Sequence, residues 1–294
     1  MSLEYILLIG KEILGLYAQV IPPMLVLAAV FTAFSIFQSQ ASTPGKVWWR
    51  SPDVALDVTY ALGNTLLAPY LSLPAMVLVT LSLSSVMTAP EVRDYISHGK
   101  GPLSVLPFWW QALAFFAISD FISYWIHRVF HGGLWRFHAI HHSGEQVDWT
   151  TAYRFHPVNI MLQPAFLTIV MLSLGVAPEV FAYFIPLEAL AATWAHSNCN
   201  WTLGPLKYII VTPVFHRWHH SSPEEGGNSN FSTTFSFWDL LFGTFYMPEG
   251  KLPQTFGIDD HDFPKQYFAQ LAYPFRVKGK DSVATAQFEP VSGS

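Results

Sequence analysis

The sequence has 294 residues, of which 51% are hydrophobic, 16% are aromatic and only 12% are charged. This composition and the positive mean hydropathy are atypical of a soluble globular domain and favour an integral membrane protein. The net charge of -5 is small and no basic run stands out, which argues against nucleic-acid binding. Cys199 is the single cysteine, so an intrachain disulfide framework and a cysteine-based metal site are both excluded.

Four regions are long and apolar enough to cross a bilayer, for which a helix needs roughly 20 residues. They are residues 14–37, 58–87, 107–127 and 158–195. The second region is broken by Gly and Pro, and the fourth is cut by "GVAP" at 175–178, which favours a helical hairpin. We therefore predict an all-α fold: an integral membrane helical bundle of about four spans, including the hairpin, with a cytosolic histidine-rich helical cap.

The start of the chain lacks the basic region and the small-residue cleavage site of a signal peptide, so we expect the first span to be retained. Most basic residues near the spans fall on one side, which places residues 127–157 and the chain after 195 in the cytoplasm. We expect three parts: N-terminal spans and loops at 1–105, a domain with three histidine clusters at 106–250 and a cytosolic tail at 251–294. The end of the tail, from residue 277, has little to bury and is expected to be disordered.

Three histidine clusters carry the chemistry of the chain. "HRVFH" contains His127 and His131, "HAIHH" contains His138, His141 and His142, and "HRWHH" contains His216, His219 and His220. Spacings of three and four residues place the imidazoles of each cluster on one face of a helix. Thr212 and Pro213 have the pattern of an N-cap and a first helical residue, so the third cluster is predicted to lie on a short helix. Eight imidazoles are too many for one metal ion and suit two.

The spacing does not identify the metal. Zinc prefers four ligands, and the H-E-x-x-H signature of zinc proteases is absent. Intramembrane haem would require single histidines on facing helices rather than dense groups at helix ends. A pair of non-haem irons suits nitrogen-rich ligation and oxygen chemistry.

The order and spacing of the three clusters resemble the fatty acid hydroxylase and sterol desaturase superfamily of integral membrane di-iron oxygenases. The resemblance extends to "WTTAYRFHP" at 149–157, to "HSN" at 196–198 and to "NFSTTFSFWDLLFGTF" at 230–245. It covers about residues 108–247. One departure is "NFS" at 230–232, where the family has "NFG".

The resemblance implies a di-iron centre on the cytosolic side of the bundle that activates O2 to attack an unactivated C–H bond of a lipid or sterol-like substrate. The eight histidines match position by position, and "HSN" makes His196 the expected ninth ligand. The H-P-G-G signature of a fused haem domain does not occur, so electrons are expected from a separate electron-transfer protein. Hydroxylation and desaturation are both open outcomes.

Two further polar residues are candidates for a supporting role. Asp120 is an ionisable residue within a span, seven residues before His127, and it is a functional candidate for that reason. We expect it to accept an N–H from a ligand imidazole and so fix the tautomer of that ligand; a structural hydrogen bond is the alternative. His156 precedes a proline and is expected to support the metal site rather than bind the metal.

Two functions from other classes remain open. A zinc-dependent membrane hydrolase would need fewer histidines and an adjacent glutamate as general base. A metal transporter or store would need polar residues along the spans as a path, and Asp120 and Glu188 are the main candidates for one.

Overall fold

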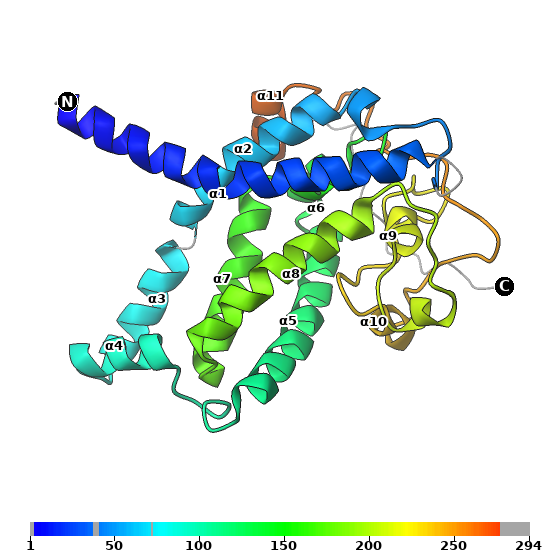
Figure 1. The fold of residues 1–294 in the computed structure, drawn as a ribbon. Coiled ribbons are helices and arrows are strands. Elements are labelled where there is room, and N and C mark those ends of the chain that lie inside the picture. Colours follow the sequence, from blue (N-terminus) through cyan, green and yellow to red (C-terminus); the bar gives the residue numbers. More distant parts are fainter. Residues whose placement is uncertain (1–2, 38–40, 72, 277–294) are drawn as a thin grey trace.

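The computed structural model describes residues 3–37, 41–71 and 73–276 (Figure 1). The regular elements in these ranges are all helical, with two isolated β-bridges, Ala41 to Cys199 and Ser221 to Phe256. The all-α prediction is therefore confirmed for the described part of the chain. The tail end from residue 277, expected to be disordered, lies outside the described residues.

The apolar regions form the longer helices. They are α1 (Leu3–Ile36), α2 (Val54–Leu71), α3 (Leu73–Ser84), α5 (Phe108–His131), α7 (Pro157–Leu174) and α8 (Pro178–His196). The second region is broken as predicted, because it forms α2 and α3. The third runs four residues past its expected end, so His127 and His131 both lie on α5.

The fourth region forms the expected hairpin of α7 and α8. Gly175 ends α7 with a φ of 70°, a left-handed conformation that glycine adopts without strain. Pro178 then occupies the first position of α8. The turn is fixed to α5 because the backbone N–H of Ala177 donates to Gln111 Oε1 at 2.9 Å. The chain thus returns to the level at which it entered, and α8 ends at His196.

Two of the described helices are long and apolar enough to cross a membrane, namely residues 11–36 of α1 and the whole of α7. Large apolar side chains on α1, α3 and α5 are exposed, among them Leu14, Leu81 and Leu113. An apolar surface of this extent marks a membrane or protein contact. The fold is therefore that of a membrane-associated protein.

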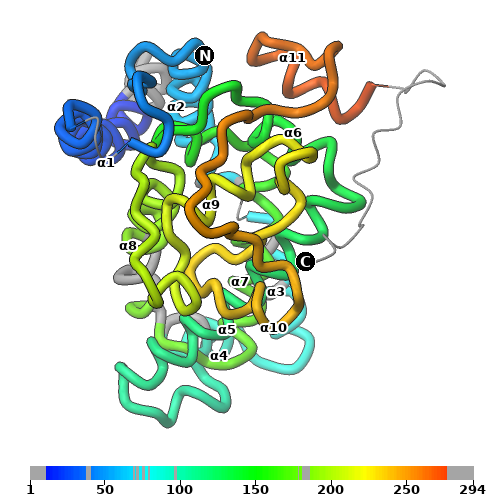
Figure 2. Tube along the Cα trace, turned by 90° about the vertical axis from the view of Figure 1, so that its right-hand side faces the viewer, coloured from blue at the N-terminus to red at the C-terminus, as the bar shows by residue number. Residues whose placement is uncertain are grey.

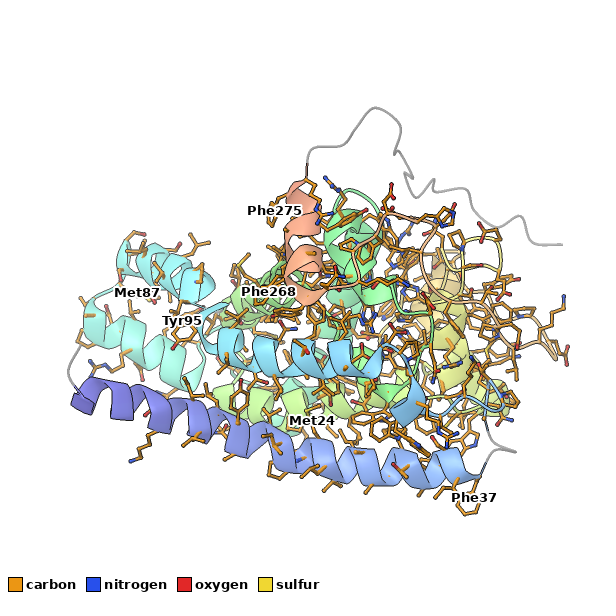
Figure 3. All side chains as sticks on the ribbon, turned by 90° about the horizontal axis from the view of Figure 1, so that it is seen from above. Met24, Phe37, Met87, Tyr95, Phe268 and Phe275 are labelled. Carbon is orange, nitrogen blue, oxygen red and sulfur yellow. The ribbon has the colours of Figure 1, made fainter. Side chains whose placement is uncertain are left out.

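Short helices form a cap at one end of the long ones. They are α6 (Trp135–His142), η3 (Trp149–Tyr153), η4 (Gly204–Tyr208), α9 (Pro213–His219), α10 (Phe237–Leu241), α11 (Tyr267–Ala272) and η5 (Tyr273–Phe275); η2 (Trp48–Arg50) and α4 (Ala89–His98) complete the described elements. Figure 2 shows α9 at the centre of this cap, with α6 and α8 on either side of it. Helices α1 and α2 lie side by side in the view from above (Figure 3). Helix α11 packs on α2, where Tyr60 Oη donates to Gln270 Oε1 at 3.0 Å.

Candidate metal centre

The three histidine motifs lie where long helices end and cap helices begin. His127 and His131 occupy the last turn and a half of α5. The second motif lies on α6, and the third lies on α9 and its C-cap. The predicted N-cap of α9 is confirmed, because Thr212 Oγ1 accepts from the backbone N–H of Phe215 at 3.2 Å. Helical spacing therefore holds each set of imidazoles on one face.

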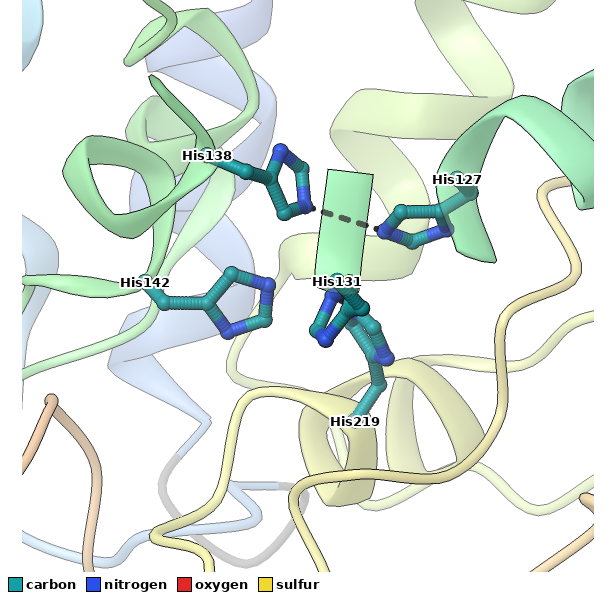
Figure 4. Close-up of side chains that lie close together, drawn as sticks. All are labelled: His127, His131, His138, His142 and His219. Atoms are coloured by element: carbon teal, nitrogen blue, oxygen red, sulfur yellow. Dashed lines mark hydrogen bonds between the residues drawn. The ribbon is translucent and has the colours of Figure 1, made fainter. Parts of the chain in front are cut away.

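Five of the histidines form a first cluster, His127, His131, His138, His142 and His219, in which one ligand atom of each lies within 4.8 Å of the others (Figure 4). His127 Nε2 and His138 Nε2 are 3.1 Å apart. His131 Nε2 and His219 Nε2 are 3.2 Å apart. We call this set the five-histidine cluster.

The other four histidines, His141, His196, His216 and His220, form a second group with the same 4.8 Å limit. His196 Nε2 lies 3.2, 3.0 and 3.1 Å from the Nε2 atoms of His141, His216 and His220. We call this set the four-histidine cluster. The two clusters adjoin, since the rings of His142 and His220 stack with centroids 4.3 Å apart.

The structure thus brings together all nine histidines expected as ligands. It also divides the two motifs of identical spacing between the clusters. In the motif on α6, His141 belongs to the four-histidine cluster, whereas His138 and His142 belong to the five-histidine cluster. In the motif on α9, His219 belongs to the five-histidine cluster, whereas His216 and His220 belong to the four-histidine cluster. Each short helix therefore contributes to both sites.

Backbone carbonyls fix the protonation of four of these imidazoles. His127 Nδ1 lies 2.7 Å from the Phe231 carbonyl oxygen, and His219 Nδ1 lies 2.7 Å from that of Ser229. His196 Nδ1 and His141 Nδ1 face the carbonyl oxygens of Ala192 and Arg154 at 2.7 and 3.2 Å. A carbonyl only accepts, so each Nδ1 carries the proton and donates. In the neutral ring, each Nε2 is then an unprotonated donor atom for a metal.

A consequence is that unprotonated nitrogens face one another. His141 Nε2 and His196 Nε2 are both held unprotonated by their carbonyl partners, yet they are 3.2 Å apart. Two lone pairs at this distance repel unless a cation lies between them. Burial lowers the pKa of His141 well below its usual range, and the neighbouring imidazoles lower it further. A second proton is therefore disfavoured, and a metal ion is the cation that fits.

The separations and the number of donors both suit bound metal ions. Metal–nitrogen bonds of about 2.1 Å place neighbouring ligand atoms about 3.0 Å apart at 90° and about 3.4 Å apart at the tetrahedral angle. Four of the Nε2 separations in the four-histidine cluster are 3.0 to 3.2 Å, within the range that these two angles span. Five donors in the other cluster exceed the four that structural zinc takes. The residues present thus fit metals of higher coordination number.

Two further nitrogens are consistent with this fit. His142 Nε2 is buried in the five-histidine cluster with no hydrogen-bond partner, and a buried polar atom of this kind requires one. The Asn159 amide lies 3.0 Å from His138 Nδ1, and its carbonyl oxygen is also without a partner. The oxygen and nitrogen of an amide are interchangeable by a 180° rotation of the side chain. After this rotation the Asn159 oxygen accepts from His138 Nδ1–H, and His138 Nε2 is unprotonated and free to bind a metal.

Asp120 lies two turns below His127 on α5, but the contact expected for it was wrong. Its carboxylate oxygens accept from Thr233 Oγ1 at 2.9 Å, from the backbone N–H groups of Thr234 and Phe235 at 2.9 and 3.0 Å, and from Trp238 Nε1 at 3.0 Å. These four donors occupy the carboxylate instead of an imidazole. Asp120 therefore anchors the segment 233–238 to α5.

Asp239 anchors residues 231 and 232, which directly precede that segment and lie closer to the histidine clusters. It accepts from the backbone N–H groups of Phe231 and Ser232 at 2.8 and 2.9 Å, and from Thr244 Oγ1 at 2.6 Å. These bonds hold the Phe231 carbonyl against His127. Burial raises the pKa of Asp239, and its hydrogen bonds oppose that shift. No motif in the sequence singled out Asp239, although it lies within the segment 230–245 that resembles the family.

His156 takes a structural place. Its Nδ1 accepts from the backbone N–H of Val158 at 3.0 Å, so it caps α7, and its Nε2 donates to the Leu271 carbonyl oxygen at 3.2 Å. Its ring packs on Phe137 and Phe275. These partners account for both ring nitrogens, and the contacts tie α7 to the C-terminal segment. Among the described contacts, His156 touches none of the nine histidines, and it reaches the site only through Phe137, which precedes His138 on α6.

Arg154 and the start of α2 provide a support for His141. Arg154 Nε lies 2.5 Å from Asp57 Oδ1, and Nη2 lies 3.1 Å from Asp53 Oδ1. Thr150 Oγ1 donates to Asp57 Oδ2 at 2.6 Å. Because the Arg154 carbonyl accepts from His141, this buried ion pair holds the His141 imidazole in place through one residue of backbone.

Comparisons with known proteins support a metal site at the two histidine clusters. Residues 112–244 match the fatty acid hydroxylase family. The chain is 35% identical over 179 residues to ornithine lipid hydroxylase OlsE of Rhizobium tropici, covering 60% of this chain and 54% of that protein. It is 37% identical over 146 residues to alkylglycerol monooxygenase of Xenopus tropicalis, covering 49% and 32%. It is 29% identical over 143 residues to methylsterol monooxygenase 1-1 of Arabidopsis thaliana, covering 46% of each.

The chain spans about half or less of the length of these three relatives. No solved structure matches it. The matched family segment contains both clusters of histidines, from His127 to His220. The resemblance predicted from the histidine motifs is thus confirmed for residues 112–244, which match the fatty acid hydroxylase family.

Proposed function

We propose that the chain is a membrane-bound non-haem di-iron oxygenase that hydroxylates a lipid or sterol-like substrate at an unactivated C–H bond. The reaction takes O2, two electrons from a separate electron-transfer protein and two protons, and it gives the alcohol and water. The observation that carries the proposal is the convergence of nine imidazoles, eight of them buried and that of His127 half-buried, into two adjoining all-nitrogen clusters. In one of them, nitrogens that carbonyl partners keep unprotonated face each other at 3.2 Å.

Iron is the metal that these donors support best. The five-histidine and four-histidine clusters would each hold one ion. Imidazole suits iron, zinc and copper alike, but the five donors of one cluster favour a metal of higher coordination number than zinc. Two bound iron ions would supply the activation of O2.

The protein side of the mechanism is orientation and exclusion of water. The carbonyls of Phe231, Ser229, Ala192 and Arg154 keep four ligand imidazoles in the tautomer that exposes Nε2. Burial lowers the pKa of the α6 and α9 histidines, so they stay neutral and able to bind metal. Asp239 and Asp120 hold the segment that presents two of the carbonyls. Preorganised ligands of this kind need no rearrangement when metal binds.

The membrane arrangement belongs to the same proposal. We place four spans at α1, at α2 with α3, at α5, and at the hairpin of α7 and α8. The histidine cap then lies on the cytoplasmic side, as the distribution of basic residues in the sequence favours. This orientation presents the metal centre to a soluble electron donor and leaves the substrate in the bilayer below it. The parts 1–105, 106–250 and 251–294 would serve as spans, catalytic domain and tail.

The names of the relatives favour hydroxylation over desaturation. The three reported relatives are a hydroxylase and two monooxygenases, and their names refer to an ornithine lipid, an alkylglycerol and a methylsterol. All three names denote oxygenation of a lipid or sterol. Desaturation remains the alternative outcome at the same site.

The test is oxygen labelling in membranes. Membranes that contain the wild-type chain or His219→Ala are supplied with 18O2 and a reductase system, and the extracted lipids are analysed by mass spectrometry. The proposal expects lipids with one 18O atom in the wild type and none in the variant, since His219 belongs to the five-histidine cluster. Lipids that lose two hydrogens without gaining 18O would establish desaturation instead. A labelled product that is equally abundant in the variant would refute the proposed site.

A further inference from the structure

An apolar groove of about 310 Å³ lies between α5 and α7. All of its lining side chains are hydrophobic, and they include Phe121, Trp125 and Val129 on α5 and Leu162 and Phe166 on α7. These five are 37% to 53% exposed, so the groove is open to the surroundings. Helix α7 is one of the two described helices that are long and apolar enough to cross a membrane, and the proposed membrane arrangement exposes the groove to hydrocarbon.

The inner wall of the groove adjoins the metal site. Phe130 lines the groove, is buried, and packs its ring against His138 of the five-histidine cluster with centroids 5.7 Å apart. Below Phe130, Gln163 Nε2 donates to Ser123 Oγ at 3.0 Å and joins α7 to α5. One aromatic ring and one interhelical hydrogen bond thus separate the groove from the histidines.

A second apolar groove of about 550 Å³, between α1 and α8, is larger but faces away from the metal site. Its α8 wall includes Leu187, Leu190 and Trp194. At about 100° per residue, these side chains point roughly 120° to 180° away from His196 on the same helix. Phe31, another lining residue, stacks on Trp149 with centroids 5.7 Å apart. This groove therefore has no lining residue that contacts a ligand histidine among the described contacts.

We propose that the groove between α5 and α7 holds one alkyl chain of the substrate lipid, and that Phe130 sets how closely the chain approaches the five-histidine cluster. The inference rests on the proposed function and adds the route and the shape of the substrate. Successive turns of α5 contribute Phe121, Trp125 and Val129, so the groove runs straight along the helix. From Phe121 to Phe130 it runs about 13 Å along the helix. A flexible methylene chain fits a groove of this form, and a polar head group stays outside it because the lining offers no polar side chain.

The binding test uses photolabelling, which needs no metal. The full chain is placed in phosphatidylcholine nanodiscs that contain a phosphatidylcholine with a diazirine in the middle of one acyl chain, and the labelled peptides are identified by mass spectrometry. Labelling is expected to be higher at residues 121–134 and 162–166 than at α3, whose exposed Leu81 reports contact with bulk lipid. Stronger labelling at 187–194 than in the groove would overturn the proposal. So would a diazirine sterol that labels the groove better than the alkyl probe.

Two tryptophan variants provide the matched comparison. Leu162→Trp fills the proposed groove, and Leu190→Trp fills the groove between α1 and α8. We expect Leu162→Trp to lower groove labelling and turnover by about fivefold or more, because overpacking an apolar site by one indole costs at least that factor. Leu190→Trp should match the wild type, and both variants should keep the wild-type metal content. Unchanged labelling and turnover in Leu162→Trp would contradict the proposed occupancy.

Phe130→Leu tests the role of Phe130 as the wall between the groove and His138. With a shorter side chain against His138, the oxidised carbon is expected to shift along the chain, which is read from fragmentation of the product. An unchanged position of oxidation in a variant with normal metal content would overturn the role of Phe130. The two proposals can be refuted separately. Photolabelling of the groove between α5 and α7 without any oxygenated lipid would refute the oxygenase function. Oxygenated lipid together with photolabelling between α1 and α8 would refute the proposed groove.

Discussion

The buried pair of Asp57 and Arg154 offers a prediction whose size follows from the structure. The side chains are 2% and 1% exposed, and Asp57→Asn would remove the charge that compensates the Arg154 guanidinium. Breaking a buried ion pair by removing one partner costs about 3 to 5 kcal/mol. Asp53 remains as a second partner at 3.1 Å, so we take the lower end, about 3 kcal/mol.

The same change should reach the metal site. With the guanidinium displaced, the Arg154 carbonyl no longer orients His141, and the four-histidine cluster should lose its ion before the five-histidine cluster does. We expect a melting temperature about 6 to 12 °C lower, from about 2 to 4 °C per kcal/mol for a protein of this size. We also expect loss of about half of the bound metal, since one of two clusters is affected. Thermal unfolding in detergent and elemental analysis measure the two effects on one preparation.

Glu145→Gln is the matched control. The ion pair of Glu145 with Lys265 has its charged atoms 3.2 Å apart, but the side chains are 67% and 84% exposed, so its loss should cost less than about 1 kcal/mol. Its metal content should be that of the wild type. A lower melting temperature in Asp57→Asn with full metal content would refute the link from Asp57 to His141. An unchanged melting temperature would refute the buried pair itself.

Three further outcomes are expected. His131→Ala and His216→Ala should each remove about one metal ion per chain, because they belong to different clusters; elemental analysis that shows both ions retained in either variant would contradict the assignment. Asp239→Asn should weaken metal binding in the five-histidine cluster more than in the other, because the Phe231 carbonyl loses its anchor against His127, and equal affinities by chelator titration would argue against this. Removal of metal by a chelator should lower the melting temperature reversibly, since the ion compensates facing lone pairs and its binding stabilises the folded state; an unchanged melting temperature in the metal-free protein would count against a metal at this site.

The histidine site could largely be predicted from the sequence because its information is local. Spacings of three and four residues on a helix define which imidazoles share a face, and the cap at Thr212 is visible in the same few residues. The partition into clusters of five and four was not predictable. It depends on how α6 and α9 face each other, which is set by contacts between distant parts of the chain.

The supporting residues illustrate the limit of spacing arguments. Asp120 lies on the face of α5 that also carries His127, so the spacing correctly indicated a polar role. The hydrogen-bond partner predicted for it was wrong, because a segment more than a hundred residues later supplies four donors to the same carboxylate. The pair of Asp57 and Arg154 joins residues 97 positions apart. The carbonyls that fix the histidine tautomers carry no side-chain signal at all.

The central claim is that the two histidine clusters hold iron, and metal analysis of the purified full chain tests it most directly. The chain is isolated in detergent from cells grown with iron and zinc both present, and the metals are counted per chain by mass spectrometry. The account predicts about two iron ions per chain, one for each cluster, and a marked loss in a variant that lacks His131 and His216. One zinc ion per chain with no iron would contradict it.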